Sequence, residues 1–159
     1  MYCQLNRKGH GFTLIEMILT IVIFSILSIV VGDLLLYSFK AYQTSTVINQ
    51  LDIMGIYVLE RIAQDLRQAS SLTTLSSTSL TYVDQLGTTY TYSLSGNSVY
   101  RNGYQMFDSI GAISFSYYDG NGNITATPSL VDYVSISLKL VRDGIYSYFS
   151  TMVAMRGTY

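Results

Sequence analysis

Residues 9–16 read Gly-His-Gly-Phe-Thr-Leu-Ile-Glu, and an apolar run behind them reaches to about Tyr37. The short leader before this stretch carries Arg7 and Lys8. A carboxylate, Glu16, lies within the first turn of the apolar run. Because a carboxylate in hydrocarbon costs about 2–4 kcal/mol, an ionisable residue at such a place indicates a functional site.

The apolar run is long enough to cross a bilayer as one helix, which takes about 20 apolar residues. Arg7 and Lys8 precede it, and the positive-inside tendency predicts that this end stays in the cytoplasm while the rest of the chain lies outside. Two alternatives stay open, an ordinary secretory signal peptide and a simple uncut anchor. The first has a shorter apolar core, of about 7–15 residues, and a small-x-small cleavage site, which is missing here.

The composition predicts one modest domain behind the apolar run. The chain has 159 residues, of which 49% are hydrophobic and 12% charged, and its formal net charge is −1. A chain of this length fits a single domain. Since binding to phosphate backbones needs clustered Lys and Arg, this charge balance predicts no nucleic-acid partner.

Cysteine and histidine are confined to the leader. The one Cys is Cys3 and the one His is His10. If the leader that contains Cys3 and His10 is removed by cleavage, the remaining chain lacks thiol nucleophiles, imidazole acid–base groups and the usual ligands of structural zinc. No phosphate-binding glycine loop or serine-histidine-aspartate set is visible either. We therefore expect no enzyme activity, no catalytic residue, no metal and no cofactor.

An amphipathic helix is predicted to follow the apolar run, because no proline interrupts residues 12–70. Spacings of three and four mark one apolar face. Its members are Val47, Leu51, Met54, Val58, Ile62, Leu66 and Ala69. The polar residues Glu60, Arg61, Gln64, Asp65 and Arg67 lie off that face, with Arg61 and Asp65 spaced as a weak surface ion pair.

Beyond Leu72 the apolar period changes to two, which predicts β-strands joined by short turns. The expected strands are 80–83, 90–94, 99–104, 110–118, 131–141 and 145–155. Hairpin-type turn signals lie at Gly96-Asn97, residues 119–122 and Asp143-Gly144. The pattern predicts an antiparallel meander, and hence an α+β fold.

Residues 11–16, between a basic leader and a membrane span, resemble the prepilin cleavage and methylation motif of type IV pilins and type II secretion pseudopilins. The resemblance implies cleavage by a prepilin peptidase after Gly11 and N-methylation of Phe12. It also implies that Glu16 pairs with the N-terminal amine of a neighbouring subunit during assembly. The processing residues would be Gly11 and Phe12, and the assembly residue Glu16.

The order of segments is similar to the pilin architecture, in which a long N-terminal helix packs by its C-terminal half on an antiparallel β-sheet. The resemblance implies a cleaved leader at 1–11, a transmembrane and assembly helix at 12–37, an amphipathic continuation at 38–70 and a globular β part at 71–159. Many relatives carry a proline in the membrane half, where this chain has Gly32-Asp33. Small residues there, namely Ser25, Ser28 and Gly32, would let helices approach closely.

Two further segments narrow the resemblance to minor subunits. Residues 59–69 and 115–122, with a late Val-x-Ile-x-Leu strand, resemble J-class minor pseudopilins and W-class minor pilins. Such subunits sit at or near the tip of a short filament and help to start its assembly. Since the tip-most class lacks the carboxylate corresponding to Glu16, the resemblance implies another subunit above this one.

Two other patterns carry competing interpretations. Asp119, Asn121 and Asn123 alternate like the oxygen ligands of a calcium loop, but Ile124 stands where glycine is required, which favours a plain turn. Most tyrosines follow residue 80 in the sequence. Those at residues 117–118 and 146–148 could form a sugar- or protein-binding face. The alternative function is thus a membrane-tethered adhesin or other binding module using that sheet.

Overall fold

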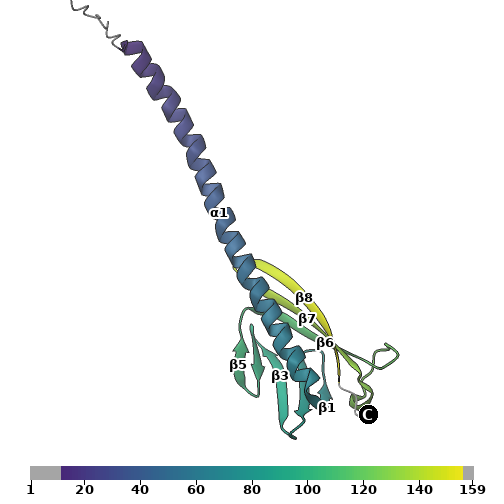
Figure 1. The fold of residues 1–159 in the computed structure, drawn as a ribbon. Coiled ribbons are helices and arrows are strands. Elements are labelled where there is room, and N and C mark those ends of the chain that lie inside the picture. The colour runs from purple at the N-terminus through teal and green to yellow at the C-terminus, as the bar shows by residue number, and fades with distance from the viewer. Residues whose placement is uncertain (1–11, 156–159) are drawn as a thin grey trace, which may run out of the picture. The chain divides into compact units, whose positions relative to one another are not determined.

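The computed structural model describes residues 12–155, which form one long helix followed by eight strands (Figure 1). The chain divides into a unit that ends at Thr44 and a unit that starts at Ser45, and each is described by itself. The helix α1, Leu14–Arg67, contributes to both units. The α+β class predicted from the sequence is confirmed, with an N-terminal helix and antiparallel sheets.

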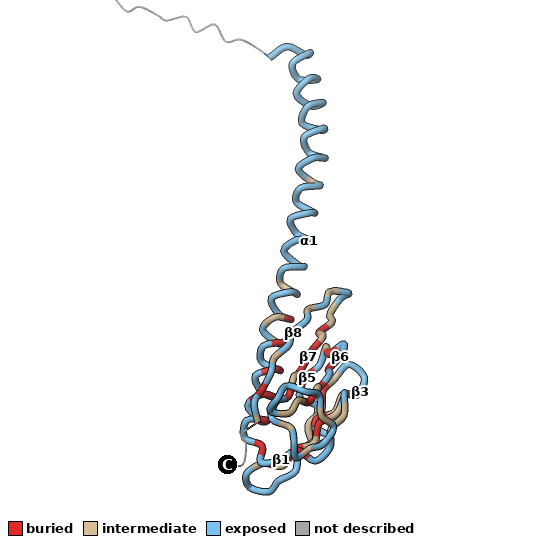
Figure 2. The backbone as a smooth tube through the Cα atoms, turned by 90° about the vertical axis from the view of Figure 1, so that its right-hand side faces the viewer, coloured by how far each residue is buried: buried red, intermediate tan, exposed pale blue. Residues whose placement is uncertain are grey.

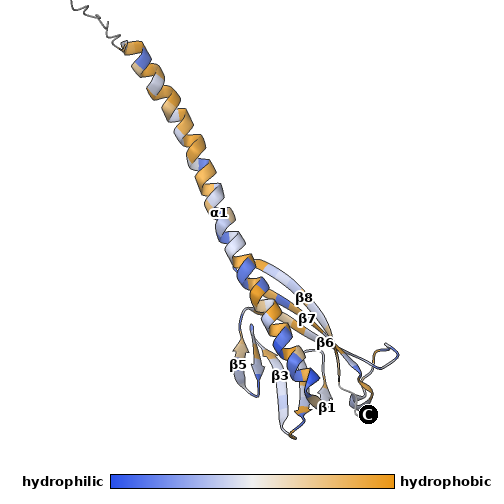
Figure 3. Cartoon of the chain, viewed as in Figure 1, coloured by the Kyte–Doolittle hydropathy of each residue, from blue (hydrophilic) through white to orange (hydrophobic). Residues whose placement is uncertain are grey.

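In the first unit, most residues of α1 are apolar (Figure 3), and their large apolar side chains are exposed. Their exposed fractions range from 49% at Ile23 to 80% at Leu14 within residues 14–37. The helix runs through Gly32 without interruption. A helix that is apolar all round has no water-facing side, which is the property of a segment that membrane or neighbouring helices surround.

In the second unit the strands form two antiparallel sheets. The five-stranded sheet runs in the order β1 (Ala69–Leu75), β2 (Ser79–Asp84), β3 (Thr89–Ser95), β4 (Ser98–Arg101) and β5 (Tyr104–Phe107). The three-stranded sheet consists of β6 (Ile110–Tyr118), β7 (Tyr133–Arg142) and β8 (Ile145–Ala154), with a 3-10 turn at Pro128–Leu130 before β7.

The structure differs from the predicted meander at two strands. The single strand expected at 99–104 is two strands, because Asn102 and Gly103 take φ values of 51° and 81° and turn the chain. The segment that follows α1 in sequence, for which no strand was predicted, is strand β1. Its backbone pairs with β2 and it buries Leu72 in the core.

The buried residues of α1 lie in its C-terminal half, as the burial colours in Figure 2 show. This half contacts both sheets, since Asp65 bonds to Tyr82 of β2 and Gly55 lies against Phe149 of β8. The predicted apolar face is confirmed, since Leu51, Val58, Ile62 and Leu66 are fully buried. At its close approach to β8, α1 carries Gly55, and an added Cβ there would overlap the ring of Phe149. A larger residue at this position would require the ring of Phe149 to move.

Asp65 lies in this core rather than at the surface, contrary to the prediction from its place off the apolar face. Its Oδ2 atom accepts hydrogen bonds from the hydroxyls of Tyr92 at 2.7 Å and Tyr82 at 2.8 Å. The Nε of Arg101 lies 3.1 Å from the same oxygen, and Nη2 of Arg61 lies 3.5 Å from Oδ1. We call these five residues the Asp65 cluster.

Ring contacts extend the Asp65 cluster. The rings of Tyr82 and Tyr92 stack with centroids 6.2 Å apart, and Tyr90 stacks on Tyr82 at 5.4 Å. The guanidinium of Arg101 lies 4.0 Å from the ring centroid of Tyr90 and donates from Nη2 to the hydroxyl of Tyr82 at 2.9 Å. Opposite charge, hydrogen bonds and a cation–π contact together offset the burial of the carboxylate.

We expect Asp65→Ala to lower the free energy of unfolding by about 3–5 kcal/mol, because it leaves Arg101 and two tyrosine hydroxyls without their acceptor. Urea unfolding of the full chain in detergent micelles, followed by the near-UV circular dichroism of its tyrosines, measures this loss. Glu60→Ala is the matched control, since that exposed carboxylate should change stability by no more than about 0.5 kcal/mol. Equal effects of the two substitutions would contradict the role of the cluster.

We also expect the second unit to lose stability in alkali. Burial raises the pKa of Tyr82 and of Tyr117 to about 12, and burial with the hydrogen bond to Asp65 raises the pKa of Tyr92. The folded state therefore holds these protons more tightly than the unfolded chain, whose tyrosines titrate near pH 10. This stabilisation is complete below about pH 10 and is lost as the pH rises towards about 12.

Thermal unfolding midpoints between about pH 8 and pH 12 measure this dependence. The midpoint should be level up to about pH 10 and fall above it. Tyr92→Phe removes one of the titrating hydroxyls, so its midpoint should start lower and fall less steeply. A wild-type midpoint that does not change up to about pH 12 would show that the tyrosine protons are not linked to folding.

Candidate processing and assembly site

The N-terminal turn of α1 is closed by Thr13 and Glu16. The backbone N–H and the hydroxyl of Thr13 each donate to Oε2 of Glu16, both at 2.9 Å. In return the N–H of Glu16 donates to the hydroxyl oxygen of Thr13 at 3.3 Å. Since α1 begins at Leu14, Thr13 is the N-cap and Glu16 the third helical residue, which makes a capping box.

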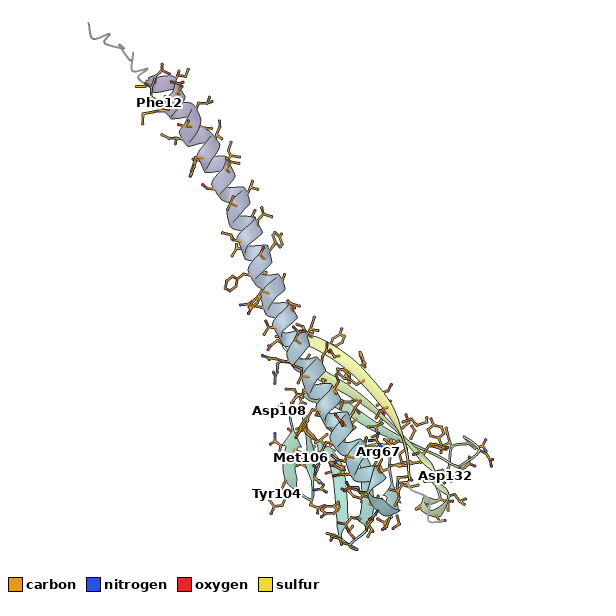
Figure 4. All side chains as sticks on the ribbon, in the orientation of Figure 1. Phe12, Arg67, Tyr104, Met106, Asp108 and Asp132 are labelled. Carbon is orange, nitrogen blue, oxygen red and sulfur yellow. The ribbon has the colours of Figure 1, made fainter. Side chains whose placement is uncertain are left out.

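Phe12 precedes this cap and is 80% exposed at the N-terminal end of α1 (Figure 4). Gly11, the predicted processing residue, lies outside the described residues. The structure therefore brings Phe12 and Glu16 to one helix end. Within residues 12–155, the ion pairs of the chain do not include Glu16, whose described hydrogen bonds come from Thr13.

The hydroxyl groups of the apolar segment bond to its own backbone. Ser25 donates to the carbonyl of Ile21 at 2.8 Å, and Ser28 to that of Phe24 at 2.7 Å. Such bonds satisfy polar groups where neither water nor a partner side chain is at hand. Of the helices in the described part of the chain, α1 is long and apolar enough to cross a membrane.

A shallow hollow of about 340 Å³ lies on this segment of α1. Its lining residues are Thr20, Ile21, Phe24, Ser25 and Ser28. The serine hydroxyls are turned back onto the helix, so the hollow offers a small-residue surface on which another helix can pack closely.

The other sequence candidates lie in the second unit. Oδ1 of Asp119 accepts hydrogen bonds from the backbone N–H of Asn121 at 3.0 Å and of Asn123 at 2.8 Å. Bonds from the backbone of Asn123 hold the pKa of the Asp119 carboxyl below its ordinary value. The three residues thus form a turn closed by its own aspartate. Within residues 12–155 no group of three or more His, Cys, Asp or Glu side chains is placed to hold a metal.

The tyrosine candidates separate into buried and exposed ones. Tyr117 is buried and its hydroxyl donates to the carbonyl of Ser76 at 2.8 Å, so it does not form an accessible face. Tyr146 and Tyr148 are 58% and 69% exposed, with ring centroids 6.2 Å apart. The ammonium of Lys139 lies 5.0 Å and 5.6 Å from these two centroids. Beside them a shallow trough of about 360 Å³ is floored by Ser114, Ser137 and Ser150.

Sequence reasoning missed two functions of carboxylates that the structure reveals. The Thr-x-x-Glu spacing at Thr13 and Glu16 is itself a capping-box signal and would have predicted the cap. The burial of Asp65 left no such signal, because its closest partners, Tyr82, Tyr92 and Arg101, come from strands distant in sequence.

Comparison with known proteins bears on the N-terminal segment. A family model described as the prokaryotic N-terminal methylation motif matches residues 6–32. Searches of curated proteins and of solved structures found no match to this chain. The matched residues include Gly11, Phe12 and Glu16, together with the cap and the first part of the apolar surface. The motif supports a type IV pilin-like chain that is anchored in a membrane and processed by a prepilin peptidase.

Proposed function

We propose that the chain is a minor pilin or pseudopilin, a structural subunit at or near the tip of a type II secretion pseudopilus or type IV pilus. The observation that carries this proposal is the carboxylate of Glu16 at the capped N-terminal turn of α1, whose large apolar side chains at residues 14–37 are exposed. The methylation motif covers the same residues.

The proposed course begins in the cytoplasmic membrane. Arg7 and Lys8 hold the leader on the cytoplasmic side, so the second unit lies outside as a periplasmic or surface domain. The peptidase cuts after Gly11, where a side chain would obstruct its approach to the backbone, and Phe12 becomes the methylated N-terminus. The role of the chain from there on is structural, with no reaction, cofactor or nucleic acid.

Assembly then depends on the apolar surface of α1 and on Glu16. The hollow at Ser25 and Ser28 admits a neighbouring helix, which replaces lipid around the segment. The carboxylate of Glu16 accepts the new amine at Phe12 of an adjacent subunit, which brings opposite charges together in a medium of low dielectric constant. The J-class and W-class resemblance of residues 59–69 and 115–122 supports the minor, initiating role.

A second candidate function rests on the exposed pair Tyr146 and Tyr148. Their rings, the cation of Lys139 and the serine floor of the trough resemble a surface for stacking and hydrogen bonding with a sugar or a protein. In that case the chain is a membrane-tethered binding module. The N-terminus of the native protein separates the two candidates.

We expect the protein recovered from its native membrane to begin at N-methylated Phe12. Intact mass spectrometry with N-terminal peptide sequencing measures this directly. Gly11→Leu should block the cut and leave a start at Met1. A wild-type start at Met1, or at a residue beyond Gly32, would refute prepilin processing and favour the binding module.

We expect Glu16→Gln to keep the cap and the membrane insertion but to impair filament assembly. The amide of glutamine still accepts the hydrogen bonds of Thr13, as Gln does in capping boxes, but it carries no charge for the neighbouring amine. Glu16→Val removes both functions and should insert at least as well, because it removes the cost of a carboxylate in hydrocarbon.

Both properties are measured in the native cells. Membrane fractionation measures insertion, and the yield of sheared filaments measures assembly. Thr13→Val is the matched control, because it removes the side-chain part of the cap and leaves the charge of Glu16. If Glu16→Gln assembles like the wild type while Thr13→Val does not, Glu16 serves the cap and the pairing role is wrong.

A further inference from the structure

The two sheets end in four edge strands, and three of these are short, irregular or covered. β1 changes register twice against β2, and β5 has only four residues. The backbone of β6 bonds to loops, since Phe115 donates to the carbonyl of Ser77 at 2.9 Å and Thr125 donates to that of Tyr117 at 3.0 Å. Bulges, short strands and covering loops are the usual protection of sheet edges against further pairing.

β8 has none of these protections. Its ten residues pair with β7 in unbroken register, contain no proline and no charged side chain, and in the described part of the chain they pair with no other strand. A long, regular and uncharged edge strand is a site at which another strand can add.

The geometry of the hairpin turn between β7 and β8 determines which backbone groups of β8 do not bond to β7. Asp143 and Gly144 have φ values of 52° and 77°, as in the two-residue turns that make the flanking residues a hydrogen-bonded pair. Hydrogen-bonded positions then alternate along the ladder. The residues of β8 whose N–H and C=O groups point to the open edge are Tyr146, Tyr148, Ser150, Met152 and Ala154.

A groove of about 390 Å³ runs between this edge and α1. On the helix side it is lined by Ile56, which is 59% exposed, and by Glu60 and Arg67, while β8 contributes residues 149–151. Figure 4 shows Arg67 at the end of α1 beside the strands. An added strand would thus find backbone partners on one side and an apolar and charged wall on the other.

Two side chains of opposite charge, Glu60 and Arg67, follow each other along the groove. Glu60 and Arg67 lie about two turns apart on one helix face, roughly 10 Å along the axis. The ion pairs that the structure describes in residues 12–155 do not include either of them. β8 runs in the same sense as α1, because Arg142 before the turn bonds to Gln50 at 3.0 Å and Phe149 lies on Gly55. A strand antiparallel to β8 therefore meets Arg67 first and Glu60 afterwards.

We propose that β8 and its groove bind an extended segment of a neighbouring polypeptide as an added antiparallel strand. The groove-facing side chains of that segment are an acidic residue towards Arg67, a basic residue towards Glu60 and an apolar residue over Ile56. Backbone hydrogen bonds to β8 supply affinity, and these side chains supply specificity. The site is a property of the second unit and does not depend on the function proposed above.

A second copy of this chain fits the edge less well. Two β8 strands related by a two-fold axis must present the same surface to each other. An axis near the middle of β8 passes close to Ser150, which lines the groove together with Glu60. The symmetric arrangement would bring two Glu60 carboxylates together, and such like-charge contacts disfavour a partner.

The test uses the full chain in detergent micelles and two synthetic peptides of about nine alternating valine and threonine residues. One peptide carries an aspartate before a lysine on its groove-facing side, and the other carries them in reverse order. Amide hydrogen exchange resolved by residue is the readout. At a free concentration ten times its dissociation constant, the first peptide should slow exchange about tenfold at the edge-facing amides that it covers, among Tyr146, Tyr148, Ser150, Met152 and Ala154, and should leave the amides that bond to β7 unchanged.

The first peptide should also bind about three- to tenfold more tightly than the second. The double variant Glu60→Lys with Arg67→Glu keeps the net charge and should reverse that preference, and its near-UV circular dichroism reports whether it is folded. Equal slowing of all β8 amides, slowing of none, or a preference that the double variant does not change would overturn the proposal. Slowing that rises with protein concentration without peptide would also overturn it, in favour of self-pairing.

Discussion

The position of α1 on the sheets of the second unit depends on one buried carboxylate. Apolar burial along the face that contains Leu51 and Ile62 supplies the free energy of packing, but such contacts tolerate small shifts. Asp65 does not tolerate them, because its donors come from β2, β3 and β4 and meet at one point. Advancing the helix by one residue turns it by about 100° and would leave this carboxylate without the tyrosines. The Asp65 cluster therefore selects one register from those that the apolar face would allow.

The parts of the fold that the sequence predicted are those with local signals. The apolar face of α1 repeats every three to four residues, and the strands around Ser135 and Ser137 alternate strictly, so both could be recognised without a partner. The burial of Asp65 could not, since its spacing to Arg61 is also that of an ordinary surface pair. Strand β1 was missed because its apolar residues are spaced by three and do not show the period of two that identified the other strands. The turn at Asn102 was missed although Asn102-Gly103 is itself a hairpin-type signal, because the apolar residues on both sides of it were assigned to one strand.

The candidate sites also divide into those with a local sequence signal and those that depend on the folded structure. The motif around Phe12 and Glu16 is contiguous, so its residues could be named from sequence, and the capping spacing was present as well. Which sheet edge stays open could not be named from sequence, because protection depends on bulges, covering loops and strand order that exist only in the folded unit. The apolar and uncharged sequence of β8 is equally typical of a central strand.

The cap at Thr13 is compatible with the proposed role of Glu16 in assembly. Both hydrogen bonds from Thr13 end on Oε2, and a carboxylate has about four acceptor positions on its two oxygens. Oε1 can therefore receive an ammonium group while the cap stays intact. An N-cap contributes about 0.5–2 kcal/mol, so a pairing that broke the cap would forfeit that amount. In the assembly proposed above, a subunit with the Thr-x-x-Glu spacing would keep its first helical turn while alone in the membrane and would add the intersubunit bond without losing that turn.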